Sequence, residues 1–255
     1  MWYLPDDTSR PVITAQEQIN SAARRGKHPH LPKTALIFFM SKGIEHLIEH
    51  HGAQQLPEEF PCFLNRKPVW VLPGTEICLL HGGAGAPQAA DTVETLRVLG
   101  VENVVTVGLF GAFVADLRPG DVVVPEKVFV EEGTTLHYCG AVDFSEPDPE
   151  AHRLAAALPG VRTDPLVSTD AVYRQTFRKE QLWRDEGAVG VDMETSAVFS
   201  VARCLGMRAV GLLAASDVHP LSPDDPKWAW HMTDDMRANL TERALQLAKA
   251  LAGQK

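Results

Sequence analysis

The feature that most constrains the fold is an alternation of short apolar runs with segments of helical periodicity. The apolar runs are bounded by turn-forming residues and lie at 34–40, 69–72, 77–80, 101–107, 121–124 and 209–213. Runs of this length and composition are typical of strands that are buried on both faces of a sheet. We therefore predict an α/β fold, with a mixed, largely parallel central sheet in a single three-layer α/β/α domain.

Helices are predicted between these strands from their start and stop signals. Pro87 suits a first helical turn, apolar residues recur at helical spacing after it, and Gly100 ends the pattern, which predicts a helix over 87–99. A second helix is predicted over 193–205, before Gly206, and a third over 233–252, where apolar residues share one face.

Length and composition narrow the class of protein. A chain of 255 residues suits one large α/β domain, for which we take 34–255, and the polar residues 1–33 are predicted to form an N-terminal arm. A net charge of −9 argues against a nucleic-acid partner, because phosphate binding needs a basic surface. Without a signal-peptide pattern or a long apolar run, we expect no membrane contact and a cytoplasmic location. The dispersed cysteines suggest no metal site.

Two glycine-rich segments follow predicted strands, where α/β proteins bind their ligands. His81 to Pro87 contains Gly83 and Gly85, and such a turn lets backbone N–H groups approach an anion, although a purely structural turn explains it equally well. Gly108 and Gly111 either allow a ligand to approach the backbone or bend the sheet, and the structural interpretation is favoured for this segment alone.

Acidic residues follow two further predicted strands. Asp192 and Glu194 lie at a strand–helix junction, where a carboxylate accepts hydrogen bonds from two sugar hydroxyls or simply complements the helix dipole. Ser216 and Asp217 lie at the end of the run 209–213, where a carboxyl group exchanges a proton with a heterocycle nitrogen or caps the next turn.

Taken together and in this order, the segments over roughly 67–220 resemble the purine nucleoside phosphorylase and uridine phosphorylase superfamily, which also includes nucleoside hydrolases. Residues 83–87 resemble its first glycine loop, 107–111 its second, and 191–194 its ribose-binding segment. The resemblance implies cleavage of the N-glycosidic bond of a nucleoside by the domain 34–255, without a metal or organic cofactor. It also implies a homo-oligomer, which is a dimer, trimer or hexamer in the family.

The resemblance assigns roles to individual residues. Glu194 would hold the ribose hydroxyls and Asp217 would protonate or hydrogen-bond N7 of a leaving purine, which makes these two the catalytic residues. Gly83 and Gly85 would form the loop for phosphate or another nucleophile. The resemblance places the following residues around the substrate: Thr106, Gly108, Leu109, Phe110, Val172, Tyr173, Arg178, Asp192, Met193 and Ser216. Asp217 indicates a purine, whereas Arg178 is weaker evidence for a pyrimidine.

The sequence leaves open whether phosphate or water is the nucleophile. Phosphorylases of the superfamily carry an arginine before the second glycine loop and a serine within it, but this chain has Thr106 and Leu109, which cannot replace a guanidinium group. The order of the segments favours phosphorolysis with inorganic phosphate as co-substrate, giving free base and ribose 1-phosphate. The missing arginine favours a nucleoside hydrolase, and a non-catalytic nucleoside-binding protein is the third hypothesis. Compensating charge would have to come from Arg24, Arg25, Lys27 or Lys33, for which a solvated surface position is the default.

Overall fold

The computed structural model describes residues 7–21, 28–64 and 66–254. Within these residues the main sheet has ten strands, with the order β11-β10-β8-β12-β7-β1-β6-β5-β2 and with β9 paired to β8. The strands are β1 (Thr34–Phe38), β2 (Gln54–Gln55), β5 (Val69–Val71), β6 (Ile77–His81), β7 (Asn103–Ala112), β8 (Val122–Glu131), β9 (Phe144–Ser145), β10 (Val161–Thr169), β11 (Gly190–Asp192) and β12 (Arg208–Val218). A separate hairpin pairs β3 (Phe60–Pro61) with β4 (Arg66–Lys67).

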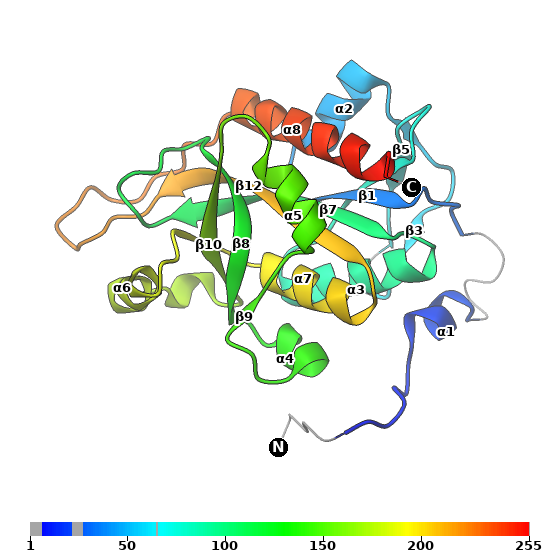
Figure 1. The fold of residues 1–255 in the computed structure, drawn as a ribbon, viewed down its shortest axis with the longest axis horizontal. Helices are drawn as coiled ribbons and strands as arrows, with labels where there is room; N and C mark the ends of the chain where they lie inside the picture. Colours follow the sequence, from blue (N-terminus) through cyan, green and yellow to red (C-terminus); the bar gives the residue numbers. More distant parts are fainter. Residues whose placement is uncertain (1–6, 22–27, 65, 255) are drawn as a thin grey trace.

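Helices cover the sheet on both faces, as Figure 1 shows. On one face lie α2 (Gly43–His51), α5 (Pro149–Ala156) and α8 (Asp234–Ala252), and on the other lie α3 (Ala86–Val98), α4 (Thr134–Cys139) and α7 (Thr195–Cys204). The buried side chains accordingly form two large clusters, one on each face of the sheet. The predicted three-layer α/β/α domain with a mixed sheet is therefore confirmed.

The short helix α1 (Ala15–Ile19) lies within the predicted arm and packs against the domain. Thr14 and Glu17 form a capping box at its start, which stabilises even so short a helix. Ile19 is buried, and Gln18 Nε2 donates a hydrogen bond to the Pro61 carbonyl at 3.0 Å. The described part of the arm is thus held on the surface of the domain beside α3.

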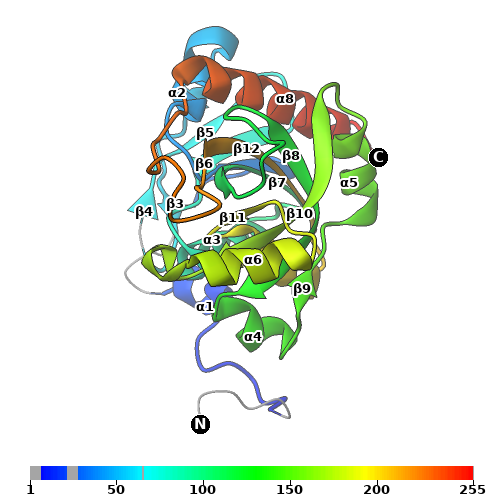
Figure 2. The same ribbon diagram turned by 90° about the vertical axis from the view of Figure 1, so that its left-hand side faces the viewer.

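One end of the sheet closes on itself. Strand β11 pairs with β10 on one side and with β7 on the other, so that β7, β12, β8, β10 and β11 form a ring. The pairing sets Gly190 opposite Ala112 and Val191 opposite Gly111. Helix α6 (Phe177–Asp185) lies in front of this ring in Figure 2, which views the edge where β7 and β12 end.

The predicted elements occur where expected, but β7, β8 and β12 extend several residues beyond their apolar runs. The segment 108–111, expected as a loop after a strand, continues β7, because β12 and β11 pair with its backbone on either side. Strand β10 was not predicted, because its sequence is polar and contains Pro165. That proline lies at a shift of register between Asp164 and Leu166, which is where a sheet tolerates a missing N–H group. No helix among the described residues is long and apolar enough to cross a membrane.

The ring depends on a close approach between β11 and β7, which Gly190→Ala tests. A Cβ atom at position 190 would overlap the Phe110 ring and lie 2.9 Å from the Gly111 carbonyl oxygen. We expect the free energy of unfolding in urea to fall by about 1–3 kcal/mol, the usual cost of overpacking. Gly253→Ala is the control, since its Cβ would meet nothing closer than 3.5 Å. Equal stability of the two variants would contradict the close approach.

Candidate active site

The candidate site lies where the ends of several strands meet. Strand β1 lies between β6 and β7, with Phe38 opposite both His81 and Val107, and β12 pairs with the far side of β7. These four strands are parallel, so the segments that follow β6, β7 and β12 leave the sheet at the same edge. Strand β11 runs antiparallel to β7 and brings its own end to the same region.

The first glycine segment turns from β6 into α3. Gly83 and Gly85 have φ values of +85° and +82°, a region that residues with a side chain rarely adopt. Gly85 is the residue at the N-terminal cap of α3, and its N–H group donates a hydrogen bond to Glu194 Oε1 at 2.6 Å. The structure therefore brings together the predicted glycine loop and the predicted ribose-binding carboxylate, which are 109 residues apart in the chain.

Asp192 and Glu194 have different surroundings although they are neighbours in sequence. Asp192 is only 6% exposed, and its carboxylate accepts hydrogen bonds from the hydroxyl groups of Ser168 and Thr195 and from the Thr195 N–H at 3.0 Å. It thereby fastens the start of α7 to β10. Glu194 is half-buried. Of the two, Glu194 is the carboxylate placed to accept hydrogen bonds from a sugar, while Asp192 holds the junction in position.

The electrostatics of Glu194 reflect this position. Burial raises the pKa of the Glu194 carboxyl to about 8, and the charge of the nearby Asp192 acts in the same direction. The hydrogen bond from Gly85 opposes the shift. A group that donates hydrogen bonds to Glu194 would stabilise its ionised form further.

Asp217 is surrounded by hydrogen-bond donors. Ser216 Oγ donates to its Oδ1, Trp228 Nε1 donates to its Oδ2 at 2.5 Å, and His219 Nε2 lies 3.3 Å from Oδ2. Burial opposes the charge, but the hydrogen bonds from these neighbours outweigh it and keep the pKa of Asp217 below its usual value. Asp217 is therefore a carboxylate at neutral pH.

His219 bridges two acidic residues. Its Nδ1 lies 2.8 Å from Glu180 Oε1 on α6, on the opposite side of the ring from Asp217. Burial disfavours the imidazolium, but the hydrogen bonds to Asp217 and Glu180 raise the pKa of His219 to about 9. The imidazole also lies directly over β7, because a Cβ atom on Gly111 would overlap it. Gly111 is thus needed for the histidine to fit.

A cavity of about 720 Å³ adjoins this group. Its walls are mainly apolar, as in most small-molecule sites, and Glu180 and His219 supply the ionisable groups. Two predicted base-site residues, Val172 and Tyr173, lie in its wall on a short 3₁₀ turn, Val172–Arg174. The full lining consists of Val172, Tyr173, Gln175, Thr176, Phe177, Glu180, His219, Pro220 and Trp228.

Other predicted substrate residues lie elsewhere. Thr106 and Phe110 are buried within β7, where the Phe110 ring packs against Gly190, so neither side chain is open to a ligand in this conformation. Leu109 packs against the core cluster on the α8 face, and Gly108 lies against Phe39 and Leu213.

Met193, the predicted neighbour of the sugar, is half-buried between Asp192 and Glu194. Arg178 is exposed on α6, and the cavity wall does not include it. Of the candidate phosphate-binding cations, Lys33 pairs with Glu102 at 2.8 Å just before β1, at the edge of the sheet opposite the site. Arg24, Arg25 and Lys27 lie outside the described residues.

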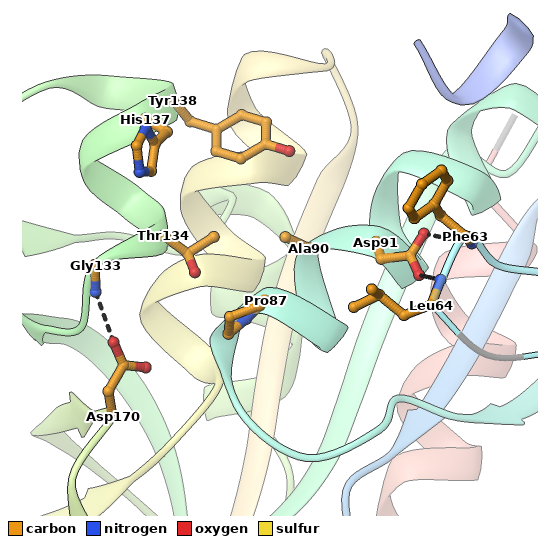
Figure 3. Close-up of a pocket in the computed structure, with 10 residues that line it drawn as sticks. All are labelled: Phe63, Leu64, Pro87, Ala90, Asp91, Gly133, Thr134, His137, Tyr138 and Asp170. Atoms are coloured by element: carbon orange, nitrogen blue, oxygen red, sulfur yellow. Dashed lines mark hydrogen bonds between the residues drawn. The ribbon is translucent and has the colours of Figure 1, made fainter. Parts of the chain in front are cut away.

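A second cavity, of about 530 Å³, lies between α3, α4 and the segment at Phe63 and Leu64, and Figure 3 shows its lining. Its two carboxylates are already paired: Asp91 accepts hydrogen bonds from the backbone of Phe63 and Leu64, and Asp170 accepts one from the Gly133 N–H at 2.9 Å. None of the predicted nucleoside-site residues lines this cavity. We therefore take the cavity beside His219 as the candidate site.

One cluster of the described residues has the composition of a metal site, and it lies apart from this cavity. His46 and His51 on α2 place their Nε2 atoms 2.6 and 2.7 Å from Oε1 of Glu242 on α8. These hydrogen bonds between two packed helices account for the cluster without an ion.

Two residues of the candidate site were not foreseen from the sequence. Glu180 lies in the mostly charged helix α6, beside the buried Trp183, and the sequence does not distinguish it from the exposed charged residues of that helix; its exposure is only 6%. Trp228 lies in the long segment between β12 and α8, where no sequence pattern indicates that it folds back onto Asp217.

Comparison with known sequences identifies related proteins. The chain is 35% identical over 141 residues to guanosine phosphorylase from Halorubrum lacusprofundi, covering 53% of this chain and 58% of that protein. It is 27% identical over 152 residues to the DeoD-type purine nucleoside phosphorylase of Listeria monocytogenes, covering 56% of this chain and 64% of that protein. The chain thus matches less than two thirds of the length of each relative.

Solved structures share the fold. Purine nucleoside phosphorylase from Toxoplasma gondii, in complex with immucillin-H, superposes with a TM-score of 0.75 at 20% identity, covering 89% of this chain and 94% of that one. AMP nucleosidase from Bacteroides thetaiotaomicron gives a TM-score of 0.68 at 20% identity, covering 88% and 91%. The model of the phosphorylase superfamily matches residues 33–252. That match spans most of the chain and confirms the resemblance seen in its motifs: the chain belongs to the phosphorylase superfamily.

Proposed function

We propose that this protein cleaves the N-glycosidic bond of a purine nucleoside, by phosphorolysis to free base and ribose 1-phosphate. The observation that carries the proposal is the presence, at one edge of the sheet, of two carboxylates whose pKa values are shifted in opposite directions. Gly85 in the glycine loop donates a hydrogen bond to Glu194, and Asp217 accepts one from Trp228, which lines a cavity large enough for a purine. Family membership supports the same reaction.

The chemistry follows from where charge develops. As the glycosidic bond lengthens, the ribose gains positive charge and the base gains negative charge. Glu194 accepts hydrogen bonds from the ribose hydroxyls and orients the sugar, while the group around Asp217 neutralises the departing base. A nucleophile then bonds to the anomeric carbon. Val172 and Tyr173 lie in the wall of the cavity that would hold the base.

A hydrolase is the second candidate, and one observation favours it. Thr106 and Leu109 occupy the positions at which superfamily phosphorylases carry phosphate-binding residues, and neither offers a charge. Thr106 is buried, and Lys33 is paired with Glu102 at the opposite edge of the sheet. For phosphorolysis, the candidate cations that remain from the sequence are Arg24, Arg25 and Lys27, which lie outside the described residues. A cation from another subunit is the alternative, and we propose a homo-oligomer. A hydrolase requires only water.

Product analysis separates the two candidates. Guanosine, inosine and adenosine are incubated with the protein, with and without inorganic phosphate, and the sugar product is identified. We expect ribose 1-phosphate that forms only when phosphate is present. Free ribose released at the same rate without phosphate would establish the hydrolase. The absence of base release under both conditions, with nucleoside bound, would leave a binding protein and contradict the proposed reaction.

Asp217→Asn tests the assignment of the residue next to the base. The amide cannot take up and pass on a proton, so cleavage of purine nucleosides should fall by about 10²–10⁴-fold, the usual contribution of positioned proton transfer. Nucleoside affinity, measured by calorimetry, should change much less. Asp225→Asn, on the exposed segment before α8, is the matched control. Unchanged turnover in Asp217→Asn would remove this residue from the mechanism.

Glu194 should make nucleoside binding depend on pH. The pKa of its carboxyl is about 8 in the free protein, and the ribose hydroxyls donate hydrogen bonds to the ionised form. Affinity should therefore rise as the pH increases from 6 through about 8 and then level off, as calorimetry with a purine nucleoside would show. In Glu194→Gln this rise should disappear and affinity should be low throughout. A wild-type affinity that is independent of pH would contradict the ribose assignment.

A further inference from the structure

The proposed reaction needs a proton that Asp217 does not carry. A purine leaves readily when its N7 is protonated, yet Asp217 accepts hydrogen bonds from Ser216 and Trp228 and faces His219, so it is ionised. Its lowered pKa is the consequence of these donors. An ionised carboxylate orients a base but has no proton to give. The proton must come from a neighbour.

His219 is the neighbour with a proton in reach. Its Nε2 lies 3.3 Å from Asp217 Oδ2, and its ring forms part of the wall of the 720 Å³ cavity. The ring is held from the other side by Glu180, whose Oε1 lies 2.8 Å from Nδ1. Gly111 lies beneath the ring, and because it has no side chain the ring fits in this position.

The two carboxylates in contact with His219 favour its protonated form. Glu180 from α6 and Asp217 from β12 contact the ring, and Trp228 contributes a neutral indole that also binds Asp217. Arg184 on α6 has its Nη1 3.9 Å from Glu180 Oε2, the other oxygen of the carboxylate that faces His219. At a pKa of about 9, His219 is an imidazolium at neutral pH.

We propose that Glu180, His219 and Asp217 form a proton relay, in which His219 supplies the proton that Asp217 passes to the leaving base. The inference rests on the proposed nucleoside cleavage and adds to it the source of the proton. Asp217 is the catalytic residue that contacts the base, whereas His219 and Glu180 act through it as positioning and proton-supplying residues.

The steps balance. As the glycosidic bond breaks, its electron pair passes to the base, and N7 takes the proton that Asp217 Oδ2 holds transiently. The proton on His219 Nε2 moves to Asp217 Oδ2, which leaves a neutral imidazole with its remaining proton on Nδ1. Glu180 stays ionised throughout and accepts the Nδ1–H hydrogen bond. Water reprotonates His219 after the base has left.

The test compares two substrates that differ in their need for a proton. Guanosine needs protonation of its leaving base, whereas 7-methylguanosine carries a methyl group and a positive charge at N7 and needs none. His219→Asn should lower kcat for guanosine by about 10²-fold, on the scale of positioned proton transfer, and should lower kcat for 7-methylguanosine by less than about threefold. His50→Asn, an exposed histidine on α2, is the matched control.

The pH profile gives a second readout. Wild-type kcat for guanosine should fall above pH about 9, because His219 can supply a proton only while it is protonated. Glu180→Gln removes one of the two carboxylates that hold the proton, so this fall should begin nearer to neutral pH. Glu186→Gln, at the exposed end of the same helix, should leave the profile as in the wild type. The profile with 7-methylguanosine should lack the alkaline fall.

The outcomes separate the relay from the reaction itself. Equal losses on both substrates in His219→Asn, or an alkaline limb that Glu180→Gln does not move, would overturn the relay and leave the nucleoside cleavage standing. A wild-type protein that cleaves neither nucleoside would overturn both. Circular dichroism reports whether His219→Asn folds. If this variant does not fold, the pH profiles of kcat for the wild type and for Glu180→Gln test the relay.

Discussion

The antiparallel pairing of β11 with β7 is the contact on which the candidate site depends. It closes the ring of strands and holds Asp192 beside β7, so that Glu194 reaches the Gly85 N–H on the turn after β6. A side chain at Gly190 would disturb this pairing, because it would overlap Phe110, and a side chain at Gly111 would displace His219. The glycines of this region therefore serve the packing of the site as well as the backbone.

Two kinds of electrostatic environment follow from this closure. Glu194 is half-buried near Asp192 and accepts a hydrogen bond from the Gly85 N–H, and its pKa is raised to about 8. Asp217 receives several donors and a cationic neighbour, and its pKa falls. In the proposed reaction, the carboxylate with the raised pKa binds the ribose and the carboxylate with the lowered pKa acts on the leaving base. The proposed reaction is therefore expected to be fastest on the alkaline side of neutrality, below the pH at which His219 loses its proton.

The sequence predicted those parts of this arrangement that local patterns encode. The apolar runs located the central strands, and the order of the glycine and acidic segments predicted one site with Gly85, Glu194 and Asp217, of which Gly85 and Glu194 are hydrogen-bonded. It did not predict β10, whose proline is tolerated only because the register shifts there. Nor did it predict Glu180 and Trp228, since each reaches the site through long-range packing that leaves no periodicity in the sequence. Thr106 and Phe110, carried over from the resemblance, are buried within an extended strand.

The most direct test of the account is a crystal structure with a purine nucleoside analogue whose base is joined through carbon and is not released. We expect the ribose hydroxyls to lie within hydrogen-bond distance of Glu194 and the base to lie in the cavity beside Val172, with its N7 position facing Asp217. An analogue bound in the cavity of Figure 3 instead, or a sugar that does not contact Glu194, would contradict the assignment of the site.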